Sequence, residues 1–137
     1  MINNSASKYL LILLLGNIVI TAFHYTDNFL NFEHYPDPSW LTQDGIWMAW
    51  IILTVCGILG YVLYIKGLFA IAYLCLGLYS ITGGLSPGHY FFPAHEAFSV
   101  KMHTFIWLDA IAGASLLTFI IWLAFLQKKP DCIAGNN

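Results

Sequence analysis

The 137-residue chain contains no arginine, and only 9% of its residues are charged. A soluble domain usually carries about 25% charged residues, so this chain has too few to cover a water-facing surface. Its net charge is −2, which argues against a nucleic-acid partner because phosphate binding needs clustered positive charge. Aromatic residues make up 17% of the chain, which argues against disorder. The composition therefore indicates a protein whose surroundings are lipid.

Several motifs that mark a cofactor or metal are also missing. The three cysteines form no CxxC pair, so the sequence implies neither a disulfide framework nor a zinc ribbon. There is no HExxH or HxxxH pair of the kind found in zinc enzymes, and no CxxCH for covalent haem. Any site must therefore be assembled from separate segments.

Four apolar runs dominate the sequence, at about 9–25, 46–65, 68–85 and 103–126. Each is near the roughly 20 residues that cross a bilayer as a helix, and helices satisfy their own backbone hydrogen bonds in lipid. We read the first run as a span because it is longer than the apolar part of a signal peptide and no A-x-A-like site follows it. Lys66-Gly67 nearly completes the connection between the middle runs, which predicts a tight antiparallel hairpin. The sequence predicts one all-α domain over 1–137, an integral membrane four-helix bundle with four transmembrane spans.

Lysine positions predict the orientation of these spans. Lysine is enriched in cytoplasmic segments, and acidic residues contribute little to orientation. The loop at about 26–45 has no lysine, and Lys101 alone falls on the other outer loop. We therefore expect a protein of the cell (inner) membrane with both termini cytoplasmic. The lysines on the cytoplasmic side are Lys8, Lys66, Lys128 and Lys129.

All five histidines fall on the outer side of this arrangement, and one of them belongs to a polar stripe on the first span. The stripe follows spacings of four, three and four residues, which places its members on one helical face. Asp27 lies on the flank of that face. Polar side chains in lipid turn toward other helices or water, so we expect the stripe to face the bundle interior. Its members are Asn17, Thr21, His24 and Asn28.

The fourth span matches the first in depth. His103, near the outer start of the fourth span, lies level with His24. Asn17 lies about 10 Å inward of His24, and Asp109 lies about 9 Å inward of His103, so these two residues also lie at one depth. The small residues within 110–115 permit close helix approach. We expect these spans to touch, with an outer layer of His24, Asp27 and His103. The inner layer is then Asn17 and Asp109.

Asp109 is costly at this depth, because a carboxylate near mid-membrane costs about 2.5–3.5 kcal/mol. No lysine lies level with it. We expect it to be protonated, hydrogen-bonded by Asn17 or Tyr79, or close to a bound cation. The plainer alternative is a neutral aspartic acid that holds helices together.

The outer histidines favour a transition-metal site. Imidazole and carboxylate groups suit zinc or copper, and four such groups complete a shell. The hypothesis is that His24, Asp27, His89 and His103 converge on one ion, for metal handling or metal-dependent chemistry. His95 is a reserve ligand.

Two alternatives stay open. In the first, the histidines are interfacial residues of a non-catalytic structural subunit or assembly factor, in a homo-oligomer or a larger membrane complex. Its contact faces would then be glycine-rich. The third interpretation is a b-type haem protein with two histidines as axial ligands, although Lys101 alone would anchor its propionates. The glycines of the proposed contact faces are Gly57, Gly60, Gly77, Gly83 and Gly84.

Overall fold

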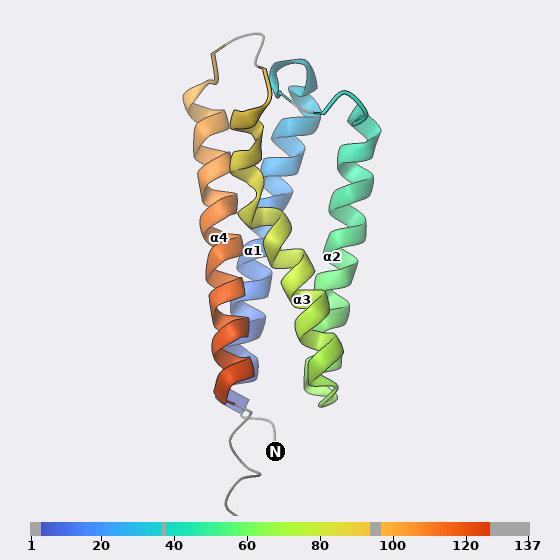
Figure 1. Cartoon of the computed structure of the whole chain (residues 1–137), viewed down its shortest axis with the longest axis vertical. Coiled ribbons are helices and arrows are strands. Elements are labelled where there is room, and N and C mark those ends of the chain that lie inside the picture. Colours follow the sequence, from blue (N-terminus) through green and yellow to red (C-terminus); the bar gives the residue numbers. More distant parts are fainter. Residues whose placement is uncertain (1–3, 37, 94–96, 127–137) are drawn as a thin grey trace, which may run out of the picture.

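The computed structural model describes residues 4–36, 38–93 and 97–126. It forms an all-α bundle in which consecutive helices alternate in direction (Figure 1). Each helix packs against the next in sequence, and α4 also packs against α1. The expected contact between the first and last spans is therefore confirmed. The elements are α1 Asn4–Leu30, η1 Phe32–His34, α2 Gln43–Ile65, α3 Phe69–Gly84, η2 Ser86–Phe91 and α4 Val100–Leu126, where η marks a 3₁₀-helix.

Three helices are long and apolar enough to cross a membrane, over Asn4–Leu30, Gln43–Ile65 and Val100–Phe125. They indicate an integral membrane protein, and their outward faces expose many large apolar side chains. The helix α3 has 16 residues and is about 24 Å long at 1.5 Å per residue, shorter than a hydrocarbon core of about 30 Å. It runs obliquely across the bundle in Figure 1, and η2 continues its path.

The helix ends follow from local sequence. Thr42 caps α2, where its side chain accepts a hydrogen bond from the Gly45 backbone N–H at 3.1 Å. Ser99 does the same for α4 by accepting from the Met102 N–H at 3.2 Å. Gly67 has a φ of +79°, a conformation that favours glycine, and it closes the predicted hairpin between α2 and α3.

The helix α1 runs past the predicted end of its span, from residue 25 to Leu30. The apolar run stops at residue 25, but the helix continues through Asp27 and Asn28, which are both buried. The apolar run therefore predicts the end of this helix too early, because the last turns carry polar side chains.

Glycines in the bundle mostly serve contacts within the chain. A Cβ on Gly57 would lie 2.9 Å from the Tyr79 ring, and one on Gly60 would lie 2.8 Å from Leu76. Gly83 faces Asp109 on α4. The expectation that these three glycines form partner-facing surfaces is therefore wrong. Gly77 and Gly84 have open space beside them.

Candidate functional site

Two histidines from separate elements lie together at the upper end of the bundle, the end that carries η1 and η2. The rings of His24 on α1 and His89 on η2 have centroids 5.5 Å apart. Tyr35 packs edge-on against both rings, at 6.0 Å from His24 and 5.2 Å from His89. His24 is only 3% exposed, and its Nδ1 has no hydrogen-bond partner among the described residues. The pair is therefore packed against Tyr35, with one buried nitrogen unsatisfied.

A backbone carbonyl fixes the tautomer of His89. Its Nδ1 lies 3.3 Å from the carbonyl oxygen of Pro36. A carbonyl oxygen only accepts hydrogen bonds, so Nδ1 carries the hydrogen and donates it. In the neutral imidazole, the lone pair is then on Nε2, which is the state of a nitrogen that binds a metal.

The histidine pair lines a cavity of about 410 Å³ between α1, α2, α3 and η2. Asn28 also lines this cavity, and its Oδ1 is buried without a hydrogen-bond partner. Ser86 contributes a hydroxyl to the wall, while Trp40, Ile46 and other residues make the rest of the lining mainly apolar. The cavity therefore combines apolar walls with a few polar groups, as ligand sites usually do.

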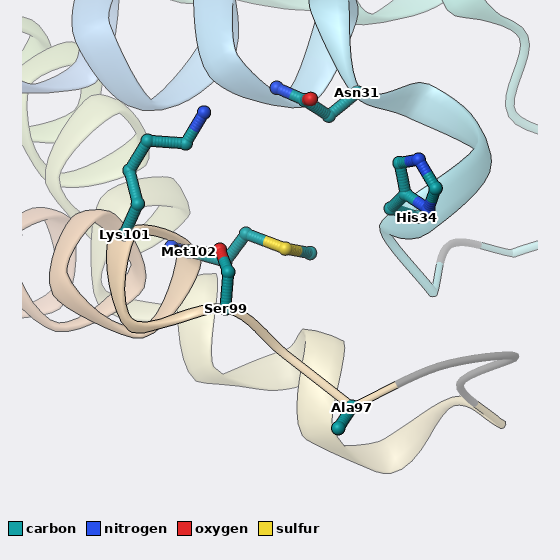
Figure 2. Close-up of a pocket in the computed structure, with 6 residues that line it drawn as sticks. All are labelled: Asn31, His34, Ala97, Ser99, Lys101 and Met102. Atoms are coloured by element: carbon teal, nitrogen blue, oxygen red, sulfur yellow. Dashed lines mark hydrogen bonds between the residues drawn. The ribbon is translucent and has the colours of Figure 1, made fainter.

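Asp27 lies beside the pair but is occupied by other partners. Its Oδ1 is 2.6 Å from the Lys101 ammonium and accepts a hydrogen bond from the Asn31 amide at 3.0 Å. Its Oδ2 accepts from the Tyr35 hydroxyl at 2.8 Å. Figure 2 shows Lys101 and Asn31 pointing toward each other at a pocket of about 420 Å³ that His34 also lines. Asp27 therefore ties α1 to α4 and to the chain after η1.

His103 lies in a different environment. Its Nδ1 is 2.8 Å from the Tyr90 hydroxyl, and its ring packs against Tyr90 and Phe98. The structure thus brings His24 and His89 together but leaves His103 and Asp27 with other partners. Across residues 4–36, 38–93 and 97–126, no three metal-ligating side chains form a group. The reserve ligand, His95, lies outside the described residues.

The inner polar layer is buried as expected, but with a different partner. Asn17 and Asp109 both face the interior. The Ser86 hydroxyl donates a hydrogen bond to Oδ2 of Asp109, in place of the expected Asn17 or Tyr79. Tyr79 instead lies 3.2 Å from the Thr21 hydroxyl, which also accepts from the Trp50 indole N–H at 3.1 Å.

Ser86 is the site residue that the expectations missed, although a local signal marks it. Residues 84–88 read Gly-Leu-Ser-Pro-Gly, which fits the G-x-S-x-G pattern of serine hydrolases. In those enzymes the serine sits on a strand-to-helix turn and is activated by a histidine. Here Ser86 is the first residue of the 3₁₀-helix η2, just after α3, and its hydroxyl donates to a carboxylate. The pattern is present without the structural context that gives it catalytic meaning.

No protein-family model, curated protein or solved structure matches this chain. The function must therefore be argued from the geometry of the site.

Proposed function

We propose that this membrane protein binds a transition-metal ion at its upper end, with His24 and His89 as the protein ligands. The observation that carries the proposal is the 5.5 Å separation of their ring centroids. Zinc-bound imidazole nitrogens lie about 2.0–2.1 Å from the ion, and at near-tetrahedral angles this places two ring centroids roughly 5–6 Å apart. The observed spacing fits one ion shared by both rings.

The surroundings of the pair support the same conclusion. Metal-ligating histidines usually donate their other N–H to a carbonyl or carboxylate, and His89 has this arrangement with Pro36. The buried Nδ1 of His24 has no hydrogen-bond partner. A buried nitrogen without a partner costs free energy. An ion bound to the His24 ring would offset that cost and fix the orientation and the tautomer of the ring.

Two protein ligands leave coordination positions open toward the cavity. Closed structural zinc sites use four protein ligands, so an open site suits an ion that is handed on or that binds a small molecule. Imidazole favours zinc or copper. Asp27 and His103 drop out of the proposed ligand set because both have other partners.

We further propose that the bundle crosses the membrane four times with the upper end facing outward. Lys8 lies near the start of α1 and Lys66 caps the end of α2, both away from η1 and η2, as expected if positive charge lies on the cytoplasmic side. Lys101 lies at the upper end, but its charge is paired with Asp27. Lys128 and Lys129 lie outside the described residues.

Metal analysis of the purified full chain tests the proposal. After equilibration with zinc or copper and removal of loose ions, we expect about one ion per chain in the wild type. His24→Ala and His89→Ala should each lose most of the bound ion, because the one imidazole that remains binds a metal ion only weakly. His34→Ala and His103→Ala are the matched controls and should retain the ion.

Equal metal content in the wild type and the His24→Ala/His89→Ala double variant would overturn the proposal. Metal-free protein that purifies with a second membrane protein would instead favour the structural-subunit alternative. A Soret band in the optical spectrum would favour haem.

A further inference from the structure

Below the histidine pair, side chains from all four helices meet in one layer. The reference point is Gly57 of α2, where an added Cβ would lie 2.9 Å from the Tyr79 ring and 3.3 Å from Leu14. Gly57, Tyr79 and Leu14 thus lie at one level of the bundle. One helical turn closer to the histidine pair lie Thr54 on α2, Gly83 on α3 and Asn17 on α1. Gly83 in turn faces Asp109 of α4.

This layer contains four buried polar atoms that find no hydrogen-bond partner in the described part of the chain: both amide atoms of Asn17, the Thr54 hydroxyl and Oδ1 of Asp109. The three residues are 2%, 9% and 0% exposed, respectively. Folded proteins rarely leave such atoms unpaired, so a cluster of them calls for a polar or ionic partner. The absence of a side chain at Gly83 lets the Asp109 carboxylate lie close to α3, because a Cβ there would be only 3.0 Å from Oδ1 of Asp109.

The charge of Asp109 has no lysine partner in this layer. The nearest lysine toward the start of α4 is Lys101, and its ammonium is 2.6 Å from Asp27. His89 is close enough to act on Asp109 electrostatically, and only its protonated form would compensate the charge. With His89 neutral, a small cation in the layer would balance an ionised Asp109.

We propose that Asn17, Thr54 and Asp109 bind a sodium ion through their side-chain oxygens. Amide, hydroxyl and carboxylate oxygens are the ligands of hard cations. One carboxylate among neutral ligands balances one positive charge, which favours a monovalent ion over calcium or magnesium. A proton would neutralise Asp109 but would leave the oxygens of Asn17 and Thr54 unsatisfied.

The cavity supplies a route to this site. Thr82 and Ser86 line the cavity, and Ser86 hydrogen-bonds directly to Asp109. Ser86 therefore separates the cavity from the proposed sodium site. It shares no ligand with the histidine pair and does not depend on the proposed transition-metal site.

Thermal unfolding of the purified full chain in matched concentrations of NaCl, KCl and choline chloride tests the proposal. A ligand that binds only the folded state raises Tm, and we expect NaCl to raise it by about 3 °C or more over choline chloride. Asp109→Asn and the near-isosteric Thr54→Val should abolish this difference. Glu33→Gln is the control, since this exposed acid lies outside the layer and should leave the sodium response intact.

If Asp109→Asn does not fold, Thr54→Val and direct binding of radioactive sodium to the wild type give the answer. Equal Tm values in the three salts, with no bound sodium, would overturn the proposal and indicate buried water only. So would a sodium response that survives in folded Asp109→Asn. The two sites can be separated, because His24→Ala should retain the sodium response and Thr54→Val, which does not line the cavity of the histidine pair, should retain zinc or copper.

Discussion

Ser86, the first residue of η2, donates a hydrogen bond to the buried carboxylate of Asp109 on α4. The bond fixes the chain where α3 ends and η2 begins, and it places Ser86 in the cavity wall. The position of η2, and with it the position of His89, therefore depends on a residue well below the histidine pair.

Ser86→Ala should destabilise the protein by about 1.5–3 kcal/mol, because it removes a donor from a buried carboxylate. Ser115→Ala is the control, since this exposed hydroxyl bonds only to the Ile111 carbonyl of its own helix at 2.7 Å. The control should change stability by less than about 0.5 kcal/mol. Unfolding in mixed micelles with increasing SDS measures both. Equal stability losses in Ser86→Ala and Ser115→Ala would show that the bond to Asp109 adds nothing to the stability of the fold.

Gly113→Ala should destabilise the contact between α3 and α4 by about 1–3 kcal/mol. An added Cβ would lie 2.6 Å from the Gly84 nitrogen and 2.6 Å from the Ser80 carbonyl oxygen, and backbone atoms cannot move aside cheaply. Gly77→Ala is the matched control, because nothing lies within 4 Å of its Cβ position. Alanine there should stabilise α3 by up to about 1 kcal/mol. Tm values of the two variants should move in opposite directions.

Asp27→Ala should cost more stability than Lys101→Ala. Loss of the carboxylate leaves the buried Tyr35 hydroxyl without its acceptor, at a cost of about 1–3 kcal/mol. The Lys101 side chain is 56% exposed, so its ion pair is screened by water and contributes about 1 kcal/mol or less. Chemical unfolding of the two variants gives the order. The reverse order would mean that the ion pair, not the hydrogen bonds, fixes this end of α1.

Thr21→Val should destabilise the bundle by about 1–3 kcal/mol, because its hydroxyl serves both Tyr79 and Trp50. The indole emission of Trp50 should shift as well, although the other tryptophans dilute the signal. Thr118→Val is the control, since this exposed hydroxyl bonds only to the Ala114 carbonyl at 2.8 Å. A stability loss in Thr118→Val equal to that in Thr21→Val would contradict the special role of the interior threonine.

Cysteine labelling of intact cells tests the orientation. In a variant without native cysteines, an impermeant reagent should label Ser39→Cys from outside and miss Lys66→Cys until the membrane is opened. These positions lie in the connections at opposite ends of α2. The reverse pattern would place the histidine pair on the cytoplasmic side.

Depth along a helix could be predicted from the sequence, because each residue adds a fixed rise. This is why the burial of Asn17 and Asp109 and the contact between α1 and α4 were anticipated. The direction of a side chain around the helix axis depends on crossing angles that no residue count supplies. His24 and His103 were therefore assigned to one layer, although His103 is exposed beside Tyr90.

Loop conformation was the other gap in the sequence-based predictions. His89 was predicted as the ligand from the second outer loop, with His95 in reserve, and the structure does place His89 beside His24. The bond from Ser86 to Asp109 joins a loop to mid-helix, and spacing along the chain gives no signal for such a contact. Tyr35 was missed for the same reason.

The buried polar face of α1 also constrains how the protein is made. This helix is synthesised before α2 and α4, which pack against it, and its Asp27 meets Lys101 only after α4 is synthesised. Alone in lipid, the stripe would be exposed at a cost of several kcal/mol. Glycosylation mapping should find α1 inserting poorly as an isolated segment and well in the full chain. Insertion of the first helix is thus a cooperative step completed by the last one.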